Sequence, residues 1–200
     1  MSVAGCSGSG KTRLVLEIIE NRKTLIDKPL NKVLYIYNSD QEIFHTFAQA
    51  NPDVIFTPTI PDITELENCL IFFDDFLQEF EKGPLNEFIN RIAIRERHHR
   101  NISVIVTTQN PYPKGLRVYN INCNYLLLFK FPRDKSIIYS IGAQVAPGKK
   151  DFLLKAYDLA LSLRKYGYLV LDFSTDQNED CRFRSSLFPD FFCFVYKPLY

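Results

Sequence analysis

The sequence has little net charge and no long apolar run, and each shortage excludes a class of protein. Lysine and arginine number 24 against 23 acidic residues, which gives a net charge of +1 at pH 7. The chain as a whole therefore does not attract nucleic acid, and any such contact must come from a local patch or from patches summed over several copies. The apolar runs YLLLF and FFCFVY are far shorter than the roughly 20 residues that cross a bilayer. We expect no contact with a membrane.

Patterns of cysteine and histidine that bind metals are also missing. The five cysteines are scattered, and no two have the CxxC spacing. His98 and His99 are adjacent, but neighbouring residues of a helix point about 100° apart, and we find no further ligands to complete a site. We expect reduced cysteines, no structural zinc and a soluble intracellular chain.

Strand-like and helix-like segments alternate along the chain. Continuous apolar runs predict buried strands, with a short one at 54–56 and longer ones at 32–38, 69–76, 102–110, 124–131 and 166–174. Helical spacing of apolar residues covers 12–23, 40–51 (beginning with Asp40 as N-cap), 83–101, 135–141 and 150–165. This order predicts an α/β fold with a mostly parallel sheet. Without repeats or linkers, we expect a single domain over 1–200 with an irregular tail at 180–200.

Residues 5–12, GCSGSGKT, match the pattern G-x-x-x-x-G-K-[ST], and an amphipathic helix follows. The glycines allow successive backbone N–H groups to point at phosphate oxygens, and the helix N-terminus adds its positive end. Lys11 is expected to reach the β- and γ-phosphates of ATP, and the Thr12 hydroxyl to bind Mg²⁺. A plain Gly-Ser turn before a helix is the alternative. The expected nucleotide contacts are Gly5, Cys6, Ser7, Gly8, Ser9, Gly10, Lys11, Thr12 and Arg13. Because this motif begins so early, no signal peptide is expected.

Two acids end the strand LIFFDD. A carboxylate at the tip of a buried strand beside the phosphate loop can hold Mg²⁺, and we assign this role to Asp74. Asp75 takes the place where a second acid polarises the attacking water, although Asp is one methylene shorter than the commoner Glu. The alternative is an acid pair that caps the next segment.

Thr107, Thr108 and Gln109 end the following strand. In P-loop ATPases with an added strand, this strand lies between the P-loop strand and the acidic strand, and its polar tip faces the γ-phosphate. Gln109 could orient water there, or it could be an ordinary surface residue of a turn.

These blocks together resemble the FtsK–HerA superfamily of ring-forming, DNA-pumping ATPases. The segments HHRNISVIVTTQNPYPKG, NYLLLFKFPRDKS, KYGYLVLDFS and RFRSSLFP are similar to a narrower group, the genome-packaging ATPases of large DNA viruses and of Polinton (Maverick) virus-like elements. The resemblance runs from Ala4 to about Pro189. It implies a P-loop NTPase of the RecA/ASCE type, a three-layer sandwich.

The resemblance also implies partners. Such ATPases form rings that move double-stranded DNA into a preformed capsid, in the cytoplasm or nucleus of the host cell or on the virion. They use an arginine finger from a neighbouring subunit, for which Arg97 is our first candidate and Arg100 and Arg133 are alternatives. Basic side chains that could follow a DNA backbone, or simply be solvated, are Lys114, Arg117, Lys130 and Lys135.

The chain departs from the pattern at its start. The strand before a phosphate loop normally has five or six apolar residues, and only Ser2, Val3 and Ala4 are available here. The missing ladder bonds and buried side chains are worth several kcal/mol, on the order of the stability of a domain. Three hypotheses follow: an active packaging ATPase, a nucleotide-binding module without turnover, or a truncated relic of an integrated element.

Overall fold

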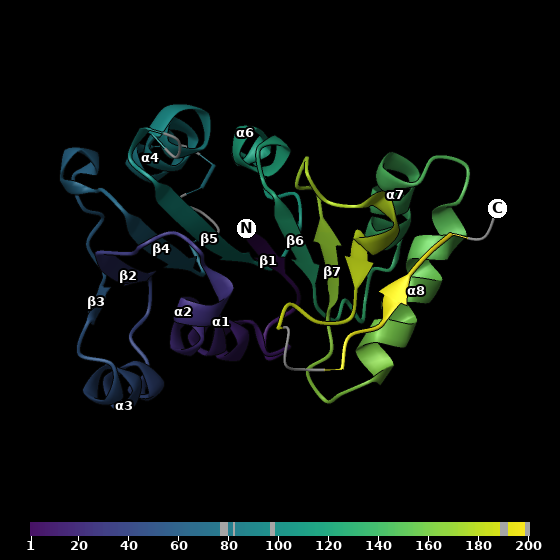
Figure 1. The fold of residues 1–200 in the computed structure, drawn as a ribbon, viewed down its shortest axis with the longest axis horizontal. Helices are drawn as coiled ribbons and strands as arrows, with labels where there is room; N and C mark the ends of the chain where they lie inside the picture. Colours follow the sequence, from purple (N-terminus) through teal and green to yellow (C-terminus); the bar gives the residue numbers. More distant parts are fainter. Residues whose placement is uncertain (77–79, 82, 97–98, 189–191, 199–200) are drawn as a thin grey trace.

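The computed structural model describes residues 1–76, 80–81, 83–96, 99–188 and 192–198. Within these residues the strands form one sheet in the order β3-β2-β4-β5-β1-β6-β7-β8-β9, shown in Figure 1. Strands β1 to β6 run parallel, and β7 to β9 continue the sheet in antiparallel fashion. The strands are β1 (Ser2–Ala4), β2 (Lys32–Tyr37), β3 (Val54–Thr57), β4 (Cys69–Asp74), β5 (Ile102–Thr108), β6 (Tyr125–Leu128), β7 (Leu169–Asp172), β8 (Phe183–Arg184) and β9 (Val195–Tyr196).

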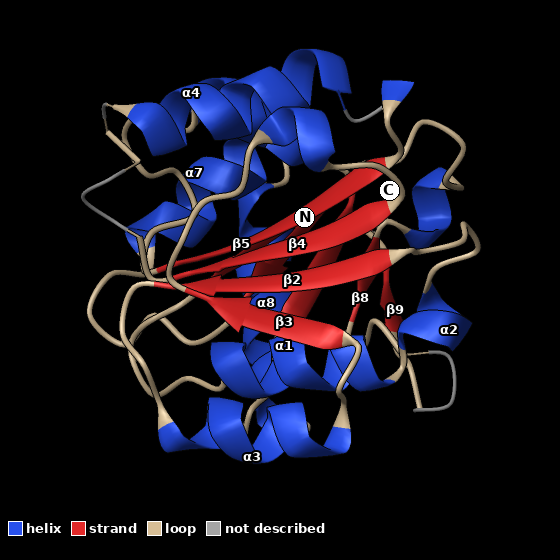
Figure 2. Ribbon diagram, turned by 90° about the vertical axis from the view of Figure 1, so that its left-hand side faces the viewer, coloured by secondary structure: helices blue, strands red, loops and turns tan. Residues whose placement is uncertain are grey.

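Helices cover both faces of the sheet, so the fold is the predicted three-layer sandwich (Figure 2). Strand β4 shows why its sequence is a continuous apolar run: Leu70 and Phe72 pack toward α1 and α3, whereas Ile71 and Phe73 pack toward α4. Helices α7 and α8 cover the β6 and β7 end of that second face. The helices are α1 (Lys11–Glu20), α2 (Arg22–Leu25), α3 (Glu42–Ala50), α4 (Pro84–Arg91), α6 (Arg117–Ile121), α7 (Ser136–Val145) and α8 (Lys150–Ser162), with short turns η1 (Ile63–Glu65), η2 (Ile92–Glu96) and η3 (Glu179–Cys181).

Strand β1 lies in the middle of the sheet although it has only three residues (Figure 1). It pairs with β5 on one side and β6 on the other, so β5 is inserted between β1 and the acidic strand β4, as the sequence predicted. Ser2 faces Val106, and the Met1 amino group donates to the Val104 carbonyl at 2.7 Å. Before Val106, the side of β5 that faces away from β4 borders a cavity of about 450 Å³ instead of a strand.

Three local expectations were wrong. Helix α3 has Gln41 as its N-cap, and Asp40 lies one residue earlier, where its carboxylate accepts from the Gln41 amide at 2.9 Å. The helix expected over 83–101 is α-helical over Pro84–Arg91 and π-helical over Ile92–Glu96 (η2), so it is not one regular α-helix. The segment from 180 is not entirely irregular, since β8 and β9 add to the sheet.

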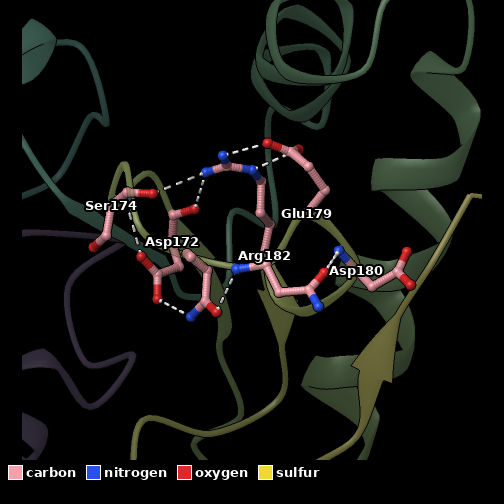
Figure 3. Close-up of polar contacts among 7 residues, drawn as sticks. Asp172, Ser174, Glu179, Asp180 and Arg182 are labelled. Carbon is pink, nitrogen blue, oxygen red and sulfur yellow. Dashed lines mark hydrogen bonds and ion pairs between the residues drawn. The ribbon is translucent and has the colours of Figure 1, made fainter.

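A polar network around Asp172, at the end of β7, fixes the segment that leads to β8 (Figure 3). The buried carboxylate accepts from the Ser174 amide at 3.0 Å and from the Gln177 amide group at 2.7 Å. Arg184 of β8 forms an ion pair with it at 2.8 Å, and Arg182 donates to the Asp172 carbonyl at 2.9 Å. These bonds add to the ladder with β7 and to the buried Phe183 side chain in holding the two-residue strand β8 on the sheet. No helix in the described ranges is long and apolar enough to cross a membrane.

Candidate nucleotide-binding site

The phosphate loop is tied to the ends of the two strands that flank β1. The Gly5 amide donates to the Thr108 carbonyl of β5 at 3.1 Å, and the Cys6 amide donates to the Lys130 carbonyl just after β6, also at 3.1 Å. A Cβ atom at Gly5 would lie 2.4 Å from the Cβ of Phe129, so only glycine fits this close approach. The position of the loop is therefore set by its neighbours on both sides.

The loop then curls into the N-terminus of α1. Gly8 and Gly10 have φ angles of +71° and +106°, which other residues adopt at a cost. The Ser9 hydroxyl is buried and has no hydrogen-bond partner in the described part of the chain. A buried orphan hydroxyl next to free helix N-terminal amides is a set of donors that suits an anionic group. The residues present thus fit a bound phosphate.

Lys11 lies inside this cradle with its ammonium group turned onto the backbone. The Nζ atom donates to the Gly5 carbonyl at 2.7 Å and to the Cys6 carbonyl at 3.0 Å. Burial lowers the pKa of the Lys11 ammonium, and the nearby charges of Asp74 and Asp75 offset only part of that shift. A polyphosphate would supply the negative charge that this desolvated cation lacks.

Asp74 is buried at the tip of β4 and is held from three elements. Its Oδ2 atom accepts from the Tyr35 hydroxyl of β2 at 2.7 Å and faces the Thr12 hydroxyl at 3.4 Å. Its Oδ1 atom accepts from the Thr107 hydroxyl of β5. Burial, followed by the negative charge of Asp74, raises the pKa of Tyr35 far above its ordinary value, so this phenol remains a donor. The two oxygens expected to bind Mg²⁺, on Thr12 and Asp74, are therefore brought together.

Asp75 and Gln109 also meet, at the exposed rim of the same site. Asp75 has a left-handed φ of +61°, and its amide donates to the Thr107 hydroxyl at 3.3 Å. The Gln109 side-chain amide donates to Asp75 Oδ1 at 3.4 Å. An Asp in this backbone region is strained by roughly 1–3 kcal/mol, and such strain is common at functional sites.

These groups share one cavity of about 350 Å³, which opens at the carboxyl ends of β4, β5 and β1. Two residues that the sequence analysis missed, Gln41 and Tyr166, also line it. No signal in the sequence marks Tyr166, which lies within a segment predicted as a strand. The cavity is lined by Ser7, Gly8, Gly10, Lys11, Thr12, Arg13, Gln41, Asp74, Asp75, Gln109 and Tyr166. Within the described ranges no three His, Cys, Asp or Glu side chains gather, so a cation here would depend on Thr12, Asp74, phosphate and water.

Neither of the two arginine candidates that the structure describes, Arg100 and Arg133, lines this cavity. Arg97 is outside the described residues. Arg100 precedes β5, at the opposite edge of the sheet, where it donates to Glu96 at 3.0 Å and to the Thr64 carbonyl at 3.1 Å. Burial alone would raise the pKa of Glu96, but its hydrogen bonds to arginine hold the pKa below the ordinary value. Arg133 is exposed in the segment after β6. Arg100 is thus not brought to the cavity of its own chain.

The basic residues considered for DNA are all exposed. Lys130 and Lys135 follow β6, and Lys135 forms an ion pair with Asp158 at 2.8 Å. Lys114 and Arg117 lie between β5 and β6, with Arg117 at the start of α6. Exposure leaves these cations accessible to phosphate groups.

The sequence matches no protein-family model and no curated protein. The structure, however, is similar over its whole length to the genome-packaging NTPase B204 of Sulfolobus turreted icosahedral virus 2, solved with sulfate, with a TM-score of 0.58, 14% identity and 96% of that chain covered. The fold is that of a P-loop NTPase. The DNA-packaging ATPase B204 of Sulfolobus turreted icosahedral virus is similar at a TM-score of 0.57 and 13% identity, with 100% and 97% of the two chains covered. The cytoplasmic domain of EssC matches 70% of this P-loop chain, and 32% of its own, at a TM-score of 0.50 and 15% identity. B204 is a genome-packaging NTPase, the kind of protein that the sequence blocks resemble, and at such identities the likeness concerns the fold.

Proposed function

We propose that the chain is a Mg²⁺-dependent ATPase that moves double-stranded DNA as a ring of identical copies, in the manner of genome packaging. The observation that carries the proposal is the meeting of Lys11, Thr12, Asp74, Asp75 and Gln109 around one cavity. A P-loop alone would suit many nucleotide-binding proteins. Acids at the tip of β4 and an amide at the tip of β5 add the groups that hydrolysis requires.

The residues around the cavity divide the work of binding phosphate, holding Mg²⁺ and activating water. The loop amides, Ser9 and Lys11 bind the phosphates, while Thr12 and Asp74 hold Mg²⁺, which would neutralise charge on the phosphates. Asp75 accepts a proton from the attacking water, and Gln109 orients that water.

B204 is a genome-packaging NTPase whose structure was solved with AMPPCP and with ATP-gammaS. The likeness to it supports ATP as substrate and DNA as partner. Capsid proteins and an intracellular or virion-associated location belong to the same proposal. The arginine finger would come from a neighbouring copy, with Arg97 as the first candidate and Arg100 or Arg133 as alternatives.

The test is phosphate release from Mg·ATP with and without duplex DNA. We expect DNA to stimulate hydrolysis, and stimulation to fall as salt rises because backbone contacts displace counterions. Lys11→Ala should abolish turnover. Lys23→Ala, which removes an exposed lysine of α2 that does not line the cavity, should not. Absence of turnover by the folded protein with DNA would refute the proposal.

The second candidate, nucleotide binding without turnover, is favoured by one observation. The carboxylate of Asp75 and the amide of Gln109 face each other at 3.4 Å, on a backbone that is already strained at Asp75. If these groups stay engaged with each other, ATP will raise the melting temperature while no phosphate appears. Asp75→Asn then changes nothing measurable, whereas in the active ATPase it abolishes turnover and keeps ATP binding.

A further inference from the structure

The candidate site has two unlike ends, one on each side of β1. The reacting groups Asp74, Asp75 and Gln109 come from β4 and β5, on one side. On the other side lie β6 and β7, which are antiparallel. Because β7 runs against β6, its first residues lie at the edge where β6 ends and the phosphate loop begins. Tyr166, three residues before β7, thereby reaches the same cavity.

Tyr166 packs directly against the phosphate loop. A Cβ atom at Gly10 would lie 2.9 Å from Tyr166 Cβ, so the tyrosine touches the loop backbone. The guanidinium carbon of Arg13 lies 5.7 Å from the centre of the ring, and Lys165 Nζ lies 5.4 Å from it. These contacts are within the range of cation–π attraction and orient the ring beside the loop.

The turn that carries Tyr166 has little freedom. The Gly167 amide donates to the Arg164 carbonyl at 3.0 Å, and a Cβ atom at Gly167 would lie 2.7 Å from the Ala160 carbonyl oxygen of α8. The ring is therefore presented to the cavity by a tight turn. A stacking surface that is already placed loses little entropy when a ligand binds.

Tyr168, two residues after Tyr166, differs from it by packing in the interior of the protein. Tyr168 is buried, accepts from the Leu187 amide at 3.3 Å and lies 4.4 Å from the guanidinium carbon of Arg164. Tyr166 is only half-buried, and its hydroxyl has no hydrogen bond within the described ranges. Tyr168 thus anchors the turn, whereas the Tyr166 ring borders open space.

We propose that Tyr166 is the platform on which the base of the bound nucleotide stacks, with Arg13 beside it. The proposal rests on the proposed nucleotide site. From β5 to β7 there are three strand spacings, or about 14 Å, a span that suits an extended nucleoside triphosphate. With its phosphates on Lys11, the base is directed toward β7. Stacking of a base on an aromatic ring has the required strength, about 1–3 kcal/mol.

The experiment compares two ligands by calorimetry, Mg·ATP and Mg·tripolyphosphate, the second having no base. We expect Tyr166→Ala to weaken ATP binding about 5- to 150-fold while tripolyphosphate binding is unchanged. Tyr166→Phe should bind both ligands as the original protein does. Tyr139→Ala, an exposed tyrosine of α7, is the matched control and should alter neither.

Two results would overturn the inference, and they are distinguishable. If Tyr166→Ala weakens the binding of ATP and of tripolyphosphate equally, the ring only shapes the phosphate loop, and the proposed nucleotide site itself stands. If the original protein binds neither ligand, the proposed nucleotide site fails and the stacking inference fails with it. Lys11→Ala separates these cases further, because it should weaken both ligands together.

Discussion

The hydrogen bond from Tyr35 to Asp74 permits a quantitative prediction about the acid that is expected to hold Mg²⁺. Tyr35→Phe removes one oxygen atom and leaves the ring, whose centroid lies 4.8 Å from that of Phe44 and 5.0 Å from that of Phe56. Packing is therefore conserved. The Oδ2 atom of Asp74 would lose its 2.7 Å bond and keep only the 3.4 Å contact with Thr12.

Hydrogen bonds to charged groups contribute about 1.5–3 kcal/mol, and we expect the free energy of unfolding to fall by about that amount. Domains of ordinary stability have about 5–15 kcal/mol, so the loss is measurable by urea denaturation. Because the pKa of Tyr35 is raised by burial and by Asp74, its phenol is protonated in the folded chain throughout the usable range. Unfolded tyrosine also keeps its proton below about pH 10. The loss should therefore be the same at pH 6 and pH 9.

Tyr37→Phe is the control, since it lies on the same strand and its hydroxyl has no hydrogen bond to any residue that the structure describes. We expect this variant to differ from the original protein by less than about 0.5 kcal/mol. Equal stability of Tyr35→Phe and Tyr37→Phe would refute the reasoning. It would mean that Asp74 is satisfied without the phenol.

Two further predictions concern stability. Gly115 and Gly148 have similar φ angles of +83° and +79°, but an added Cβ atom would lie 1.9 Å from the Phe80 carbonyl oxygen at Gly115 and would meet nothing within 4 Å at Gly148. Thermal or urea unfolding should therefore show a loss of about 1–2 kcal/mol for Gly148→Ala and of about 3 kcal/mol or more for Gly115→Ala. Equal losses would contradict the steric argument. Burial alone would raise the pKa of Asp172, but its hydrogen bonds and the charge of Arg184 hold that pKa below its ordinary value. A lowered carboxyl pKa stabilises the folded chain above the unfolded pKa of about 3.9 and ceases to do so as pH falls through the folded value. Asp172→Asn should therefore be less stable at pH 7 and lose less stability between pH 5 and pH 2, and an unchanged acid-unfolding curve would contradict the ion pair.

The phosphate loop could be predicted from the sequence because its geometry is local. Eight consecutive residues specify the turn, the helix start and the donors, so Lys11 and Thr12 were expected in one cradle, and both line the same cavity. Asp74 and Gln109 could be added because the carboxyl ends of parallel strands meet at one edge. The long strands were predicted for a similar reason, since burial on both faces gives continuous apolar runs such as that of β4.

The remaining contacts depend on strand direction and on pairs distant in sequence. Tyr166 reaches the cavity because β7 is antiparallel to β6, which an apolar run does not reveal. Tyr35 lies in the middle of β2, where an aromatic residue is expected to pack rather than to bind Asp74. Arg100 lies two residues before β5, and the site lies at the opposite end of that strand. The two-residue strands β8 and β9 are too short for any periodicity to predict.

The short β1 was expected to cost stability, and the structure separates that cost from the support of the phosphate loop. Support of the loop comes from the last residues of the neighbours: Phe129 donates to the Ala4 carbonyl at 2.8 Å, and the Gly5 amide donates to Thr108. On its β1 side, the beginning of β5 has no strand partner and borders the 450 Å³ cavity, at the opposite edge from Asp74. A strand with few ladder bonds therefore lowers the free energy of unfolding without displacing the cradle. Loss of stability and loss of nucleotide binding are therefore separate expectations, and only a displaced cradle would produce the second.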